Sequence, residues 1–242
     1  MKLRSGGGTA VAAIIVLLAM AAFSPLKSLA SERSQFRSSA TLSPGWTPTP
    51  QGTVLFEDDF ATYSRRWREQ KSPKAAIAYR DSALNVRVVS PGVSAWSVPD
   101  FTTVVEDYSM AVTAHVYEGS RDSLFGFVLD YQDDQHFFAL MVTRDGEWRF
   151  VQCGGGAWID LTPPDAVPFA REPTSTTVRL RVEVTGDAFT LLVDDRLVGR
   201  VTVEDSSASG SAFGLIARAG RGFVDVSFDN ILVTGTPKVI RP

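Results

Sequence analysis

The chain is poor in the residues that build disulfide frameworks and zinc sites. Its 242 residues include one cysteine, Cys153, and two histidines, His115 and His136. A single cysteine excludes an intrachain disulfide. Three scattered nitrogen and sulfur ligands are too few for a zinc site. We interpret Cys153, in the stretch FVQCGGGAW, as a small buried apolar thiol.

The chain also lacks a basic excess and a phosphate-binding loop. It has 24 Lys and Arg against 27 Asp and Glu, for a net charge of −3. Nucleic-acid-binding proteins usually present a basic face, so we expect no nucleic-acid partner. A phosphate loop requires a lysine and the start of a helix after its glycines. Neither follows the glycine run 154–156, so this run is not a phosphate loop.

Helical periodicity is missing after residue 30, apart from Tyr63–Gln70, which could form one helical turn. Apolar residues instead recur at every second position in Tyr108–Tyr117, Val178–Val184 and Val224–Asn230. Strict alternation predicts half-buried antiparallel strands. Turn signals follow at Asp145–Gly146, Gly186–Asp187 and Asp194–Asp195. The sequence therefore predicts an all-β antiparallel sandwich over residues 52–236, with a short tail at 237–242.

The N-terminal segment has the layout of an export signal. Residues 1–30 place MKLR before the apolar run AVAAIIVLLAMAAF and end in Ser28-Leu29-Ala30, with small residues at the −3 and −1 positions. We predict a signal peptide, with an uncleaved membrane anchor as the alternative. Residues 31–51 are rich in Ser, Thr and Pro and predict a linker. The expected location is periplasmic, cell-surface or extracellular, with membrane contact only if residues 1–30 are retained.

Five stretches carry a family resemblance. They are LFEDDF followed by Trp67, ALNVRVVSPGVSAWSVP, LFGFVLDYQDDQHFFALMVTRDGEWRF, FTLLVDDRLVG and AFGLIARAGRGFVDVSFDNILV. Their order resembles concanavalin A-like, laminin-G-like jelly-roll domains, and in particular a bacterial secreted group related to the 3-keto-disaccharide hydrolase domain. The resemblance implies a jelly-roll sandwich. It leaves function open, because this fold hosts lectins, adhesive modules and glycosidases.

The acidic cluster around His136, which includes Asp133 and Asp134, is open to two interpretations. In such domains the stretch from Phe125 to Trp148 is a hairpin, with Asp133 and Asp134 at its tip. The alternative is a metal or acid–base site. Jelly-roll glycosidases of family 16 carry Glu-x-Asp-x-x-Glu on one strand, and this pattern is missing. We also find no catalytic motif for cleavage of 3-keto-glycosides.

A structural calcium ion is implied by the resemblance. In jelly-roll sugar-binding modules the first and last strands pair, and calcium often ties them together. Asp58 or Asp59 with Asp229 would supply oxygen ligands here. The alternative is that these carboxylates cap turns or accept hydrogen bonds from backbone N–H groups.

Aromatic residues supply the remaining candidates, because sugars stack their C–H faces on exposed rings. The predicted stacking residues are Trp96, Tyr131, Trp148 and Trp158, and the predicted polar partners are Asp133, His136, Arg144 and Arg149. The alternative for each tryptophan is the sandwich core, where large aromatics often lie. We predict an exported, non-catalytic module that binds a glycan or an envelope protein. The alternatives are a carbohydrate-active enzyme and an accessory subunit of a membrane complex.

Overall fold

The fold is seen in a computed structural model that describes residues 52–100, 105–170, 176–203 and 212–237. These residues form strands without any helix, which confirms the all-β prediction. The strands are β1 Thr53–Asp58, β2 Gln70–Lys71, β3 Ala75–Arg80, β4 Ala83–Val88, β5 Ser94–Ser97, β6 Val105–Gly119, β7 Leu124–Asp133, β8 His136–Thr143, β9 Trp148–Gly154, β10 Ala157–Asp160, β11 Thr177–Thr185, β12 Ala188–Val193, β13 Arg196–Thr202, β14 Ala212–Arg218 and β15 Val224–Pro237.

The predicted signal peptide and linker lie outside the described residues. Within the ranges that the structure describes, there is no apolar helix of membrane-spanning length.

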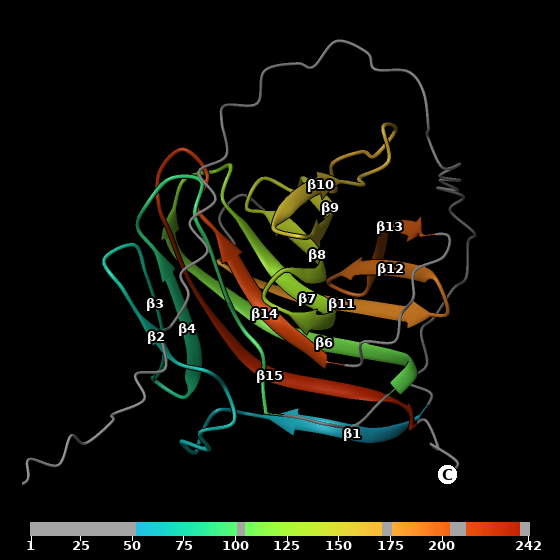
Figure 1. Ribbon diagram of the computed structural model, residues 1–242, viewed down its shortest axis with the longest axis horizontal. Coiled ribbons are helices and arrows are strands. Elements are labelled where there is room, and N and C mark those ends of the chain that lie inside the picture. The colour runs from blue at the N-terminus through green and yellow to red at the C-terminus, as the bar shows by residue number, and fades with distance from the viewer. Residues whose placement is uncertain (1–51, 101–104, 171–175, 204–211, 238–242) are drawn as a thin grey trace, which may run out of the picture.

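Two antiparallel sheets form the sandwich (Figure 1). The nine-stranded sheet has the order β13-β12-β11-β6-β15-β4-β3-β2, and β1 also pairs with β15. The six-stranded sheet has the order β10-β9-β8-β7-β14-β5. The long strands β6 and β15 run side by side through the first sheet, and β7 and β14 pair in the second (Figure 1).

The main core fills the space between the sheets. In β11 every second residue from Val178 to Val184 is buried, as its alternating sequence predicts. The facing side chains of the second sheet include Phe127, Leu140 and Phe150, each no more than 2% exposed. Removal of this apolar surface from water is the main stabilising contribution to the sandwich.

The hairpin predicted between Phe125 and Trp148 is confirmed. Strands β7 and β8 pair as far as Asp133 and His136, so Asp134 and Gln135 form the turn. The other predicted turns also lie between successive strands. Gly155 and Gly156 join β9 to β10 with φ angles of 57° and 82°. Two positive φ angles are the requirement of a tight type I′ hairpin.

The helical turn suggested for Tyr63–Gln70 is wrong. Trp67 in this segment makes a β-bridge to Pro99, and its side chain is 2% exposed. The indole packs against Phe56 and Phe60, at centroid distances of 5.9 and 5.6 Å. Burial of this large ring fixes a non-helical path for the segment, since tertiary packing outweighs local helix propensity.

Candidate functional site

The six-stranded sheet is apolar on both of its faces. Strands β7 and β8 are buried over nearly their whole length, unlike a sheet with one solvated face. The face turned away from the main core carries a second apolar cluster: Val128, Phe137, Ala139, Met141, Val151, Cys153 and Ile216, with Trp96, Leu124, Tyr131 and Trp158 packed against it. This outer face therefore carries its own packed cluster of apolar side chains.

Four aromatic rings form the most prominent part of this cluster, and we call them the aromatic platform: Trp96, Tyr131, Phe137 and Trp158. Phe137 is central, with centroid distances of 5.2 Å to Trp96, 5.6 Å to Trp158 and 6.1 Å to Tyr131. These distances lie in the range of favourable tilted and edge-to-face pairs. Phe137 is buried, whereas the other three rings remain partly exposed. These three rings therefore keep part of their surface in contact with solvent.

The sheet curls toward the platform. Trp96 lies on β5 and Trp158 on β10, which are the two edge strands of the six-stranded sheet. In a flat sheet five steps of about 4.8 Å would separate these strands by roughly 24 Å. The two indole centroids are nevertheless only 6.5 Å apart. We therefore call this side of the sheet the concave face.

Asp134 fixes two of the platform rings. Its Oδ1 accepts hydrogen bonds from the Trp96 indole, at 3.2 Å, and from the Tyr131 hydroxyl, at 2.8 Å. The guanidinium of Arg68 lies 3.4 Å from the same carboxylate. Burial, together with the bond to Asp134, raises the pKa of Tyr131 to about 12, so this phenol stays a hydrogen-bond donor.

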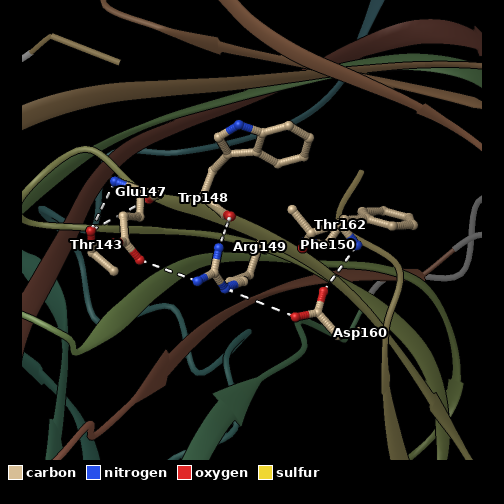
Figure 2. A network of polar contacts seen from close by, with 7 residues as sticks. All are labelled: Thr143, Glu147, Trp148, Arg149, Phe150, Asp160 and Thr162. Carbon is tan, nitrogen blue, oxygen red and sulfur yellow. Dashed lines mark hydrogen bonds and ion pairs between the residues drawn. The ribbon is translucent and has the colours of Figure 1, made fainter. Parts of the chain in front are cut away.

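Arg149 contributes a second polar group to the concave face, from β9. Its Nη2 lies 3.2 Å from Glu147, and its Nε lies 3.9 Å from Asp160 of β10. The Nη1 group donates to the Trp148 carbonyl at 3.1 Å. Figure 2 shows this network, with the Trp148 indole pointing away from Arg149. Two carboxylates thus hold one half-exposed guanidinium.

Arg218 is the third polar group, at the end of β14. Its Nη1 donates to the Ser94 hydroxyl at 3.0 Å, and its Cζ lies 5.7 Å from the Trp158 ring centroid. That distance is typical of a cation–π contact. Burial lowers the pKa of Arg218 from its usual value, because the charged form loses hydration.

Of the predicted ligand residues, the structure brings together Trp96, Tyr131 and Trp158 in the platform, and it places Arg149 on the same face of the sheet, paired with Met141 of the outer cluster. Asp133 and His136 lie beside them at the exposed tip of the β7–β8 hairpin. The two side chains bind each other at 2.9 Å rather than the platform. Contact with His136 and the Gln135 N–H lowers the pKa of Asp133, with the backbone N–H as the larger cause. Their role toward a ligand stays a prediction.

Two other predicted ligand residues lie apart from the platform. Trp148 is 3% exposed in the main core, where its ring fills the space beside Gly199. A ring buried in this way is not exposed for stacking on a sugar, so the predicted role of Trp148 is wrong. Adjacent strand residues point to opposite faces, and β9 therefore directs Trp148 into the main core and Arg149 to the concave face. Arg144 lies in the β8–β9 turn, at the other end of β8 from His136.

Sequence reasoning missed Phe137, Asp134 as an anchor, and Arg218. A signal for Phe137 was present in the pair Phe137-Phe138, since adjacent strand residues point to opposite faces. Two large apolar neighbours in a strand indicate a sheet that is covered on both sides. Alternate residues of a strand share a face, so Arg218 lies on the same face of β14 as Gly214 and Ile216.

The carboxylates predicted for calcium are engaged in local hydrogen bonds. Asp58 accepts from the Phe60 N–H at 2.8 Å and from the Trp67 indole at 3.2 Å. Asp59 accepts from the Ala61 N–H at 3.0 Å, and Asp229 from the Asn230 N–H at 2.7 Å. In the part of the chain that the structure describes, no three His, Cys, Asp or Glu residues converge as metal ligands. The calcium ion stays a prediction.

No family model and no curated protein matches the chain. Solved structures match its fold. The carbohydrate-binding module CBM66 from Bacillus subtilis has a TM-score of 0.55 at 17% identity, covering 70% of this chain and 96% of the module. A Bacillus subtilis protein of unknown function with a galectin-like fold has a TM-score of 0.55 at 10% identity, covering 76% and 96%. A xylan β-1,4-xylosidase from Bacillus halodurans C-125 has a TM-score of 0.53 at 15% identity, covering 79% of this chain and 41% of the enzyme. At these identities the matches show the fold alone, a concanavalin-like antiparallel β-sandwich.

Proposed function

We propose that the protein is a glycan-binding module and that the concave face of the six-stranded sheet is its binding site. The observation that carries this proposal is the aromatic platform, in which partly exposed rings from three separate strands, with Phe137 beneath them, are held side by side. A sugar ring has apolar C–H faces that pack on such rings. It also has hydroxyl groups that require hydrogen-bond partners when water is removed.

The polar groups around the platform match this requirement. Asp134 and Arg149 line the face with oriented acceptors and donors. Their positions are fixed by Trp96, Tyr131, Glu147 and Asp160 before any ligand arrives. Groups that are already ordered lose little conformational entropy on binding, which favours affinity.

The carboxylates of the concave face also favour binding over catalysis. Glu147 and Asp160 both contact Arg149, and Asp134 anchors two rings. Burial raises the pKa of two described carboxyls, Asp130 and Glu183. Glu183 belongs to the nine-stranded sheet, and Asp130 lies near Tyr108 of that sheet. Neither is placed to act on a sugar bound at the platform.

The enzyme alternative, a hydrolase or lyase of the 3-keto-disaccharide hydrolase type, stays a prediction. Release of a reducing sugar from a bound oligosaccharide would favour it. The two remaining alternatives, an envelope-protein ligand and an accessory subunit of a membrane complex, rest on residues 1–51 and their predicted export. Docking to an envelope protein without any glycan binding would favour them.

A glycan microarray tests the proposal. The purified protein should bind a defined subset of glycans, and Trp158→Ala should abolish that binding. Tyr117→Ala is the matched control, because Tyr117 is a 58% exposed aromatic residue on β6 of the other sheet. Unchanged binding by Trp158→Ala, or equal loss in both variants, would contradict a site on the concave face. The absence of binding to any glycan would contradict the function itself.

A further inference from the structure

Arg218 differs from the other charged groups of the concave face. Asp134 is paired with Arg68 at 3.4 Å, and both Glu147 and Asp160 face Arg149, at 3.2 and 3.9 Å. Arg218 has a serine hydroxyl and an aromatic ring as its partners, and no carboxylate of the described residues lies within ion-pair distance. Arg218 is therefore the one of these charged groups without an ion-pair partner, on a face where three guanidiniums (Arg68, Arg149 and Arg218) and three carboxylates (Asp134, Glu147 and Asp160) balance overall.

The contacts of Arg218 use only part of its hydrogen-bonding capacity. A guanidinium carries five N–H donors, and one bond goes to Ser94. The Trp158 ring supplies a further attraction through its negative face. Arg218 is partly buried, and none of its nitrogens is among the buried unpartnered atoms of the described residues, so the donors not used by Ser94 remain open to solvent or to a ligand. A partly desolvated charge gains more from a counter-charge than a fully hydrated one does. An anion that reaches this point would restore the lost interactions.

Arg218 also lies next to the aromatic platform. Its guanidinium lies over Trp158, which the proposed function assigns to sugar stacking, and it is anchored to Ser94 on the strand that carries Trp96. The planar fork of arginine matches the two oxygens of a carboxylate or a sulfate in a bidentate arrangement.

We propose that the concave face selects acidic glycans, with a sugar ring packed on Trp96 and Trp158 and its carboxylate or sulfate ester bound by Arg218. This inference rests on the proposed glycan-binding function and names the substrate class of that site. Glu147 and Asp160 would repel an anion at the Arg149 end of the face, so the charged group is oriented toward β14 and β5.

Matched ligand pairs test the inference by calorimetric titration. Hexagalacturonate against its methyl ester isolates a carboxylate, and a κ-carrageenan oligosaccharide against its desulfated form isolates a sulfate. We expect the acidic member of one pair to bind about tenfold to a hundredfold more tightly, as a charge-assisted hydrogen bond requires. The preferred pair distinguishes the two sources of charge. Raising the salt concentration should weaken only the acidic member.

Variants of Arg218 assign the preference to this residue. Arg218→Gln should bind both members of the pair equally, because the acidic member loses the advantage that the guanidinium gives it. Arg218→Lys keeps the charge without the fork, and should retain part of the preference even if Arg218→Gln folds poorly. Arg221→Gln is the matched control, because Arg221 follows β14 closely and its side chain is 94% exposed.

The outcomes separate this inference from the proposed function. Equal affinity of the wild type for acidic and neutral members, with Trp158→Ala losing both, overturns the acidic preference and leaves glycan binding intact. A preference that survives in Arg218→Gln, or a variant that loses both ligands alike, overturns the assignment to Arg218. The absence of binding to acidic and neutral glycans alike overturns the proposed function.

Discussion

The indoles of Trp96 and Trp158 come from strands at opposite edges of the six-stranded sheet, and their ring centroids lie 6.5 Å apart. This contact joins the two ends of the sheet across its concave face. It depends on the curl of the sheet and on Phe137, which packs against both rings. Substitution of either tryptophan should therefore alter the packing of the other tryptophan and of Phe137.

Trp148 and Trp158 should respond differently to truncation. Trp148→Ala leaves a cavity in the main core, where the ring is 3% exposed, and should lower the free energy of unfolding by about 3–5 kcal/mol. Trp158→Ala removes a ring that is partly in water, and should cost about half of that or less. Urea denaturation measures both values. Equal losses would contradict the placement of the two rings on opposite sides of the sheet.

Asp134→Ala should weaken glycan binding without removing any ring. The substitution deletes the shared acceptor of the Trp96 indole and the Tyr131 hydroxyl, so both rings become less ordered. Loss of one or two such bonds corresponds to roughly a tenfold fall in affinity. Asp145→Ala is the control, since Asp145 is an exposed carboxylate in the β8–β9 turn whose ion-pair partner is Arg121, at 3.8 Å. Equal effects of the two substitutions would show that Asp134 has no special role.

Much of the fold follows from local sequence pattern. The alternation in Val178–Val184 correctly predicts β11, and the paired turn signals at Asp194–Asp195 correctly predict the β12–β13 hairpin. Each of these patterns depends on residues close together in the chain. Period-two burial and turn geometry are local properties, which is why they can be read from the sequence.

The site is harder to predict because it depends on the curl of the sheet. Alternation shows that Trp148 and Arg149 point to opposite faces, but not which face meets the other sheet. The stacking role predicted for Trp148 was wrong because its face is the one that packs against the other sheet. The contact between Trp96 and Trp158 crosses six strands and has no local signal. The position of Arg218 beside the platform depends on its contacts with Trp158 and Ser94, which are distant from it in the chain.

Stability should depend on pH through Asp130. This residue of β7 is 4% exposed, and its Oδ2 has no hydrogen-bond partner in the described part of the chain. Burial, with a smaller contribution from the charge of Asp187, raises its pKa from the usual 3.8 to about 7. Between these two pH values the folded protein holds a proton that the unfolded chain has released. The contribution of Asp130 to stability therefore falls as the pH rises from about 4 to about 7, and then stays constant.

Asp130→Asn should remove this slope. Asparagine has the shape of a protonated aspartic acid and tolerates the positive φ angle of 48° at this position. The variant should be more stable than the wild type at pH 8, by an amount on the order of a few kcal/mol, and the difference should shrink toward pH 4. Thermal or urea unfolding across this range measures the effect. Parallel stability curves for the two proteins would exclude a raised pKa at Asp130.

The predicted calcium ion can be separated from the hydrogen-bonding role of Asp58. This carboxylate accepts from the Phe60 N–H and the Trp67 indole, so Asp58→Ala should destabilise the protein by about 1–3 kcal/mol in the presence of a chelator. Calcium binding would instead raise the melting temperature of the wild type, and Asp229→Ala would remove that increase. Superimposed wild-type melts with calcium and with chelator would contradict the calcium site.

A bound glycan should lie against the aromatic platform of the concave face. Indole ¹H–¹⁵N spectra of the protein, labelled at its five tryptophans and titrated with the tightest glycan from the array, test this claim most directly. The Trp96 and Trp158 signals should shift with the bound fraction, while those of the buried Trp67 and Trp148 should stay in place. Saturable binding that leaves the Trp96 and Trp158 signals unmoved would place the glycan elsewhere and would rule out the platform as the binding site.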